Sequence, residues 1–242
     1  MPNRDVAFGQ TGALLMQNIP SVDTHLHYNL ACFSDCFAFG VTKTLLFFTN
    51  ILFGKRYGHR AVAVETIAAV PGMVGGAITH LRCLQRARND NGWIRTLIEE
   101  AENERMHLMT FIQIAKPTLF ERLFIATAMW LFYFGFFALY LISAKTAHRT
   151  VGYFEEEAVN SYTQFLQAID EGRFANCAAP AIAKRYWSLP DDATLRNVVL
   201  AVRADEAHHR DVNHNFSSEL SRKPVLPISP YPEHAEEIRD IM

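Results

Sequence analysis

Apolar residues recur along this chain with the three- and four-residue spacing of helices, and no segment shows the convincing alternation of a strand. Residues 37–53 form an apolar, Phe-rich stretch in which Lys43 is the only charged residue, and residues 123–144 carry no charge. The run Asn-Asp-Asn-Gly at 89–92 predicts a turn, and Lys116-Pro117 ends a helix. We therefore predict an all-α fold with helices at about 37–53, 57–88, 93–115, 123–144, 150–170 and 193–217, and a proline-containing loop at 173–192.

Polar and proline-containing segments divide the chain into three parts. Residues 1–36 mix Pro, Asn, Asp and His without a period, which predicts an irregular N-terminal arm. Residues 37–217 contain the predicted helices and form the expected bundle domain. Residues 218–242 include four prolines, which predicts an irregular tail.

Composition suggests a large core or contact with lipid. Half of the residues are hydrophobic, and charged residues make up 20%, against about 25% in an ordinary soluble domain. The net charge of −2 gives no reason to expect nucleic acid as a partner. The four cysteines lack zinc-like or disulfide spacing, so we expect a reducing compartment. The N-terminus resembles neither a signal peptide nor a transit peptide, as in a bacterial protein or a trimmed organellar one.

Two Glu-x-x-His pairs, Glu104–His107 and Glu206–His209, are the strongest chemical feature of the sequence. Residues three apart share one face of a helix, so each pair offers a carboxylate and an imidazole to one point. Two such pairs, with one glutamate from each of two further helices, form the ligand set of dimetal four-helix bundles. Glu65 lies in the first bundle helix, and a run of three glutamates begins the third.

Helical phase selects among these glutamates. Positions 155, 158, 162, 165 and 169 read Glu, Ala, Tyr, Phe and Ile, so Glu155 continues an inward apolar face. Positions 195, 199, 202, 206, 209 and 216 read Leu, Val, Val, Glu, His and Phe, which includes Glu206 and His209. The rival pair Asp205–His208 falls one residue outside that face. Asp205 is therefore expected to orient a ligand histidine.

A single Glu-x-x-His pair is more often part of a solvated helix face than a metal site. Two pairs on apolar faces, joined by inward glutamates of two other helices, favour a dimetal site, because buried carboxylates need neutralising cations. Carboxylates with two imidazoles suit iron or manganese. Tyr162 lies two turns from Glu155 on the same face. Its position alone favours a core tyrosine over an electron donor.

Longer motifs around these residues resemble the alternative oxidase family. Residues 99–111 read Glu-Glu-Ala-Glu-Asn-Glu-Arg-Met-His-Leu-Met-Thr-Phe, and residues 203–214 read Arg-Ala-Asp-Glu-Ala-His-His-Arg-Asp-Val-Asn-His. Residues 65–76 and 155–162 match two further blocks of the family, so the resemblance covers about residues 55–216. It implies a ferritin-like four-helix bundle with a long crossover helix and additional membrane-associated helices. It also implies a cyanide-insensitive ubiquinol oxidase that reduces O2 to water with two iron ions (Fe2+/Fe3+) and pumps no protons.

The same resemblance assigns roles to individual residues. The iron ligands that it implies are the set that helical phase selects, whereas the redox-active role implied for Tyr162 reverses the interpretation from position. The resemblance implies iron ligands at Glu65, Glu104, His107, Glu155, Glu206 and His209, outer partners at Asn103, His148 and Asp205, and a quinol pocket at Arg60, Glu157, Ala158 and Ser161.

One stretch departs from the family pattern. Many members carry Leu-Arg-x-Pro-Thr-Asp before the Arg-Tyr-Gly block, whereas residues 45–50 here read Leu-Leu-Phe-Phe-Thr-Asn. The arginine and aspartate of that run, which the family associates with the quinol pocket, are Leu46 and Asn50. We expect the difference to affect quinone preference and affinity and to leave the metal site unchanged.

The apolar segments raise the question of how the chain meets a membrane. Residues 123–144 are long enough to span a bilayer. We favour a crossover helix with one face in the core and one in lipid, because the helices before and after it contribute to one metal site. Residues 37–53 are expected to be a second lipid-facing helix, and a buried core position is the alternative for both. The resemblance implies a homodimer that binds at the membrane interface. The expected partners are ubiquinol, O2 and the lipid bilayer surface. The expected location is a bacterial or mitochondrial inner membrane.

Three other interpretations remain open. A ferritin-like iron store would use similar ligands but would have a soluble surface, which the phenylalanine-rich segments disfavour. A di-iron oxygenase or desaturase would need a hydrocarbon substrate and a separate electron donor protein. A membrane bundle without metal is disfavoured by glutamates on the inward faces of four helices.

Overall fold

The computed structural model describes residues 23–221, which fold into helices without any strand in this part of the chain. Most of the predicted arm and nearly all of the predicted tail lie outside the described residues. The all-α prediction is confirmed. The helices are α2 (Phe33–Phe53), α3 (Tyr57–Arg86), α4 (Trp93–Ala115), α5 (Leu119–Ile142), α6 (Ala144–Asp170), α7 (Ala181–Tyr186) and α8 (Leu195–Ser221).

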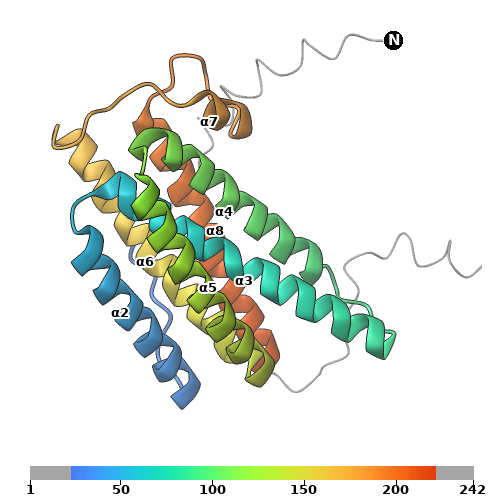
Figure 1. The fold of residues 1–242 in the computed structure, drawn as a ribbon. Helices are drawn as coiled ribbons and strands as arrows, with labels where there is room; N and C mark the ends of the chain where they lie inside the picture. Colours follow the sequence, from blue (N-terminus) through green and yellow to red (C-terminus); the bar gives the residue numbers. More distant parts are fainter. Residues whose placement is uncertain (1–22, 222–242) are drawn as a thin grey trace, which may run out of the picture.

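Four helices form the bundle. The most extensive helix contacts pair α3 with α4 and α6 with α8 (Figure 1). The long helix α5 lies against α3 and α6 and carries the chain back along the bundle, so that α4 and α6 run in the same direction (Figure 1). The predicted four-helix bundle with a long crossover helix is therefore confirmed.

The predicted helix ends follow local backbone chemistry. Asn91 and Gly92 adopt positive φ angles of 55° and 85° in the turn between α3 and α4, as expected of Asn and Gly. Lys116 ends α4 with a φ of 48°, directly before Pro117.

Three helix starts lie earlier than predicted. The helix α5 begins at Leu119 rather than at residue 123, because the Thr118 hydroxyl accepts the N–H of Glu121 and caps the helix. The helix α2 begins at Phe33, inside the predicted arm, because the Asp35 carboxylate accepts the backbone N–H groups of Ala31 and Cys32. The helix α6 begins at Ala144 rather than near residue 150, because the Ser143 hydroxyl accepts the N–H of Thr146 and caps the helix. The starts of α2 and α6 were not predicted because Asp35 and Arg149, which lie near them, look solvated in the sequence. Both side chains are buried in the structure.

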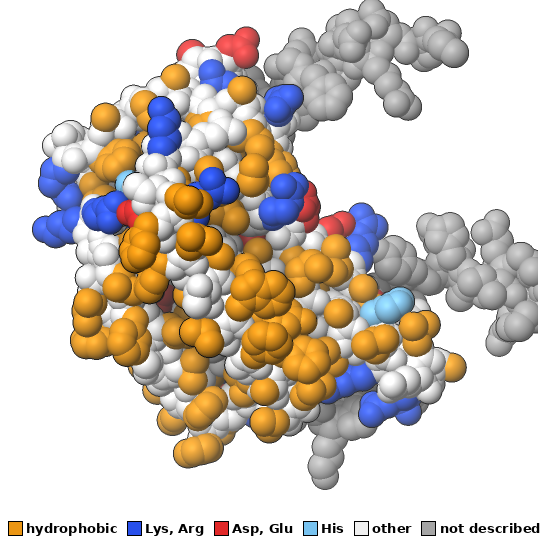
Figure 2. Space-filling model, viewed as in Figure 1, with side chains coloured by type: hydrophobic (Ala, Val, Ile, Leu, Met, Phe, Trp, Pro, Cys, Tyr) orange, Lys and Arg blue, Asp and Glu red, His pale blue; other side chains and the backbone are white. Residues whose placement is uncertain are grey.

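Two helices outside the bundle expose apolar side chains. By length and composition, α2, α3 and α5 could each cross a membrane, but the most apolar part of α3 is 61% buried, against 11% for α2 and 17% for α5. Figure 2 shows hydrophobic side chains gathered where α2 and α5 lie in Figure 1. Such a surface fits association with a membrane. The exposed side chains include Phe37, Phe47, Phe48, Ile51 and Leu52 of α2, and Phe120, Leu123, Trp130, Leu131 and Phe134 of α5.

The close approach of α3 and α4 depends on a glycine. A Cβ atom added at Gly72 would lie 2.3 Å from the backbone oxygen of Leu97 and 3.0 Å from the Cβ of Ala101. Because a backbone oxygen has no flexible side chain to move, the two helices would have to separate. Both helices carry predicted metal ligands, so this spacing also positions the metal centre.

We predict that Gly72→Ala lowers the free energy of unfolding by about 1–3 kcal/mol through overpacking. The matched control is Gly135→Ala in α5, where an added Cβ meets nothing within 4 Å. The control should stabilise its helix by up to about 1 kcal/mol, because alanine has the higher helix propensity. Thermal unfolding in detergent measures both effects, and equal melting temperatures for the two variants would contradict the packing argument.

Candidate metal centre

The six predicted ligands converge inside the bundle from four helices. Glu65 comes from α3, Glu104 and His107 from α4, Glu155 from α6, and the last pair from α8. All six side chains are buried, and the most exposed residue, His209, is 5% exposed. Their ligand atoms form two groups, each within 4.8 Å, and both groups contain Glu104 and Glu206. The first group adds Glu65 and His107, and the second adds Glu155 and His209.

The chemistry of this cluster fits metal ions. Both carboxylate oxygens of Glu104, the Oε1 atom of Glu206 and the Nδ1 atom of His209 are buried and make no hydrogen bond. The His209 Nδ1 atom lies 2.7 Å from a Glu104 oxygen. The carboxylate oxygens lie within ion-pair distance of imidazole nitrogens, but none of these atoms makes a well-directed hydrogen bond, which is costly in a protein interior, and cations shared by the carboxylates would remove that cost. Each group supplies three carboxylates and one imidazole, a donor set that suits iron or manganese.

Burial and mutual repulsion shape the protonation of the cluster. Burial, together with the charges of Glu206 and Glu104, raises the pKa of Glu65 well above its usual range. Burial opposes ionisation of Glu104, yet the neighbouring His107 and His209 lower its pKa well below the usual range. Burial likewise opposes ionisation of His107, but the charge of Glu104 raises its pKa well above the usual range. Protons therefore compete with metal ions for these ligands, and metal binding must release protons.

Asp205 lies behind His107, where the sequence predicted an orienting partner. The Nε2 atom of His107 is 3.1 Å from an Asp205 oxygen, which leaves Nδ1 facing Glu65 and Glu206 at 3.2 Å. That Asp205 oxygen also accepts the amide of Asn103 at 3.1 Å and the indole N–H of Trp187 at 2.8 Å. The carboxylate therefore fixes the ring orientation of His107 and leaves Nδ1 free for a metal.

His148, which was predicted to be an outer partner of the donor set, is linked to it through one residue, Asn213. Its Nδ1 atom is 2.9 Å from the side-chain oxygen of Asn213, and its Nε2 atom is 3.0 Å from the Tyr140 hydroxyl. Asn213 in turn donates to the backbone oxygen of His209 and to both oxygens of Glu100, each at 3.0 Å. Burial lowers the pKa of His148 to about 4, so the ring is neutral. Any influence of His148 on the donor set passes through Asn213.

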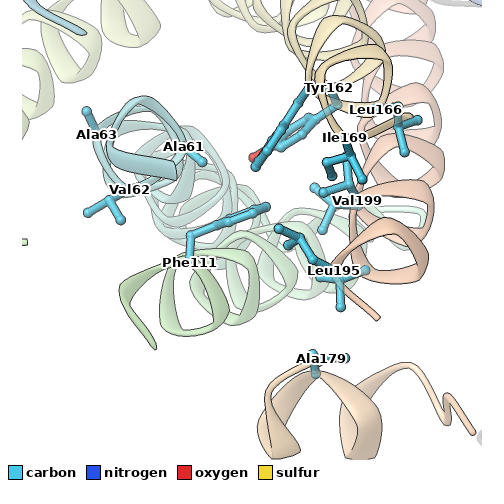
Figure 3. Packing of buried hydrophobic residues seen from close by; sticks show 14 of the residues in the cluster. Ala61, Val62, Ala63, Phe111, Tyr162, Leu166, Ile169, Ala179, Leu195 and Val199 are labelled. Atoms are coloured by element: carbon cyan, nitrogen blue, oxygen red, sulfur yellow. The ribbon is translucent and has the colours of Figure 1, made fainter. Parts of the chain in front are cut away.

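Tyr162 contacts the donor set directly. Its hydroxyl donates to a carboxylate oxygen of Glu65, and its ring stacks on Phe111 with centroids 5.6 Å apart. Figure 3 shows the Tyr162 side chain pointing from α6 toward α3 beside Phe111. Burial and the Glu65 charge raise the pKa of Tyr162 well above its usual range, so the phenol keeps its proton.

An apolar cavity of about 730 Å³, partly open to solvent, reaches the donor set at Glu155. The four predicted quinol-pocket residues, Arg60, Glu157, Ala158 and Ser161, all line this cavity, and so does Leu46. The remaining walls are mainly aliphatic and aromatic side chains of α2, α3, α5 and α6.

Charged groups in this cavity have identifiable partners. Arg60 donates to the side-chain oxygen of Asn50 at 2.8 Å, while its buried Nε atom makes no hydrogen bond. Glu157 pairs with Lys43 of α2. A smaller cavity lined by Tyr162 shares Arg60, Ala158 and Ser161 with the apolar cavity.

Sequence reasoning missed the groups that surround the ligands. The predicted 173–192 loop contains the short helix α7, which is followed by Trp187, the indole donor to Asp205. Glu100 and Asn213 were also missed, although each lies one helical turn from a ligand on its own helix. That spacing was the available signal for both residues, whereas an indole in a loop has no such spacing.

We predict that Asp205→Asn lowers iron affinity by about 10- to 100-fold, because a neutral amide orients and polarises His107 less well. The matched control is Asp211→Asn, a residue of α8 whose side chain is 51% exposed and pairs with Arg210. Iron retained after equilibration with a graded series of chelator concentrations measures the affinity. Equal retention in the two variants would show that Asp205 does not tune the ligand.

Comparisons with known proteins agree with the geometry of the centre. The family model "Alternative oxidase" matches residues 17–218. The chain is 55% identical over 194 residues to ubiquinol oxidase 2, mitochondrial, of Nicotiana tabacum, covering 80% of this chain and 65% of that relative. It is 54% identical over 200 residues to ubiquinol oxidase 1a, mitochondrial, of Arabidopsis thaliana, covering 83% of this chain and 56% of that relative. The chain thus spans less than two thirds of the length of these relatives. It belongs to the alternative oxidase family.

Proposed function

We propose that this protein is a ubiquinol oxidase that passes electrons from ubiquinol to O2 and forms water. Two quinols supply the four electrons and four protons that reduce one O2 to two waters, and no proton pumping is required. The proposal is supported by family membership and by the names of the relatives. The observation that carries it is the apolar cavity that reaches Glu155, because a lipophilic reductant can approach the buried donor set there.

The six buried donors are the proposed ligands of two iron ions. One ion would be held by Glu65 and His107 and the other by Glu155 and His209, with Glu104 and Glu206 common to both. Iron supplies the one-electron chemistry with O2 that amino-acid side chains lack. The four carboxylates neutralise the charge of the ions, and Asp205 keeps His107 oriented toward them.

Arg60 and Glu157 are the proposed polar contacts of the quinol. The Arg60 guanidinium lines the cavity and can donate to a quinol oxygen, and the remaining cavity walls suit the ring and the isoprenoid tail. Ala158 and Ser161 line the same cavity. Ala158 lies one helical turn from the proposed ligand Glu155 and from Tyr162, and Ser161 directly precedes Tyr162. The quinol proton would pass to Glu157 or to a carboxylate of the metal centre.

Tyr162 is the proposed redox-active residue. Its hydroxyl is hydrogen-bonded to the proposed ligand Glu65, so the phenol could give its proton to that carboxylate and one electron to the proposed iron centre, which would be reduced by that electron. Burial among apolar side chains keeps competing reductants and water from the ring. These contacts outweigh the preference for a core role that position alone suggested.

Membrane attachment is proposed to occur through α2 and α5 without a spanning segment. Their outward faces are apolar, and the bundle behind them carries the donor set at one depth. Since the relatives are mitochondrial proteins, we propose the inner membrane of mitochondria, with a bacterial inner membrane as the alternative. Exposed Met73, Leu81 and Leu84 of α3 give a second copy of the chain an apolar surface, so a homodimer is also proposed.

We predict that membranes containing this protein consume oxygen with a short-chain ubiquinol in the presence of cyanide, and that the protein contains about two irons per chain. Glu104→Ala should lose both iron and oxygen uptake, because both groups of ligands need this carboxylate. Glu102→Ala, an exposed residue of α4 that pairs with Arg105, is the matched control and should keep both.

Different failures of this assay have different meanings. Iron without quinol-driven uptake would favour a di-iron oxygenase or desaturase that needs a donor protein. Iron in a soluble, cage-forming assembly without uptake would favour an iron store. A folded protein without iron would contradict the metal centre itself.

We predict that Tyr162→Phe abolishes quinol-driven oxygen uptake while iron content stays unchanged, because phenylalanine keeps the packing but cannot lose an electron and a proton. The matched control is Tyr153→Phe, a buried tyrosine whose hydroxyl donates to the backbone oxygen of Tyr28, away from the donor set. Oxygen uptake and iron content are measured on the same preparations. Normal uptake by the Tyr162 variant would eliminate the redox role.

A further inference from the structure

A second cavity reaches the donor set from a different side. It lies between α4 and α8, beside Tyr186 of α7, and its empty space of about 660 Å³ includes volume that is open to solvent. In contrast to the apolar cavity, it is lined mostly by polar residues, and several of them have side chains that can ligate a cation. These side chains are Glu99, Glu100, Asp205, His208 and His209.

The polar groups form a path from the surface inward. Glu99 and His208 are exposed. The Glu99 carboxylate accepts a hydrogen bond from the Nε atom of Arg95, on the same helix, at 2.8 Å. Glu100 is only 5% exposed, and both of its oxygens face the amide of Asn213. At the inner end of the path lies His209, a proposed iron ligand with 5% exposure.

The apolar cavity is a poor route for an ion. A hydrated ferrous ion binds water oxygens tightly and loses them only as other ligands replace them. The walls of the apolar cavity are mainly carbon, the Glu157 carboxylate among them is already paired with Lys43, and the cationic Arg60 guanidinium also lines that cavity. The polar cavity offers carboxylates and imidazoles in succession, so the ion can exchange ligands stepwise without being fully stripped of them.

We propose that this polar cavity is the route by which ferrous iron reaches and leaves the metal centre, with Glu99 and His208 as outer relay ligands and Glu100 as the inner one. The inference rests on the proposed di-iron centre. Each step exchanges water for a protein ligand, the iron stays ferrous, and no electron moves. The carboxylates also attract the cation electrostatically and thereby raise its local concentration at the mouth of the cavity.

The test measures how fast iron leaves the intact enzyme. The holoenzyme is reduced anaerobically, and a water-soluble ferrous chelator reports iron release over time. The double variant Glu99→Gln/His208→Gln should slow release by about tenfold, because charged clefts change ion transfer rates by at least that factor. The matched control is Glu102→Gln, which removes one exposed charge from α4 outside the cavity and should release iron at the wild-type rate.

A steric pair of variants tests the route independently of charge. Val212→Trp fills the polar cavity and should also slow release. Leu45→Trp fills the apolar cavity and should raise the KM for quinol without changing iron release. The initial iron content separates the failure of the iron route from the failure of the metal centre. If the protein holds about two irons per chain and Val212→Trp does not change iron release, the route is wrong and the centre stands. If the folded wild-type protein contains no iron, the centre itself is contradicted.

Two further results decide against the route. If Leu45→Trp slows release and Val212→Trp does not, iron passes through the apolar cavity. If the Glu99/His208 variant is fully loaded and releases iron normally but turns over slowly, the polar cavity serves proton transfer instead of iron transfer.

Discussion

The fold depends on one electrostatic constraint: four glutamates are buried side by side with two histidines, and several of their atoms make no hydrogen bond. Ionised carboxylates in a protein interior repel each other and are poorly solvated, so the bundle accommodates them only with protons or cations between them. Each of the four bundle helices supplies at least one of these ligands, and their axes must therefore approach closely. Gly72 permits this approach between α3 and α4 by leaving room for the Leu97 backbone oxygen.

The same constraint explains the polarity of the surroundings. The apolar cavity is lined in part by α2 and α5, the helices that expose phenylalanines, whereas the cavity between α4 and α8 is lined mostly by polar residues. If the buried centre meets a lipophilic reductant and hydrophilic ions, as we propose, it needs separate approaches, because one lining cannot stabilise both. The bundle provides them because the ligands of α6 and those of α8 face different cavities, through Glu155 and His209 respectively.

Periodicity predicted the bundle helices and placed Glu155, Glu206 and His209 on inward apolar faces. The Glu-x-x-His spacing predicted Glu104 and His107, and Glu65 was the glutamate of the first bundle helix in the block that resembles the family. The structure brings those six residues together. Contacts between distant segments were not predictable in the same way. Trp187 follows a short helix in a proline-containing loop, and its contact with Asp205 depends on how that loop folds back on the bundle. The early starts of α2 and α6 were hidden for a related reason, since Asp35 and Arg149 look solvated in sequence but form a buried ion pair.

The departure at residues 46 and 50 acquires a physical meaning in the structure. Positions 43, 46 and 50 share one face of α2, and Leu46 on this face lines the apolar cavity. Asn50 accepts a hydrogen bond from Arg60, and Lys43 pairs with Glu157. An aspartate at 50 would neutralise Arg60, whereas the Asn50 amide accepts its hydrogen bond and leaves the positive charge in place. An arginine at 46 would put a cation at the cavity wall, whereas here Leu46 makes that wall apolar and the cation lies one turn earlier, on Lys43. The cavity therefore presents Arg60 as a cation without an anionic partner on α2, an arrangement that favours a ligand oxygen carrying partial negative charge.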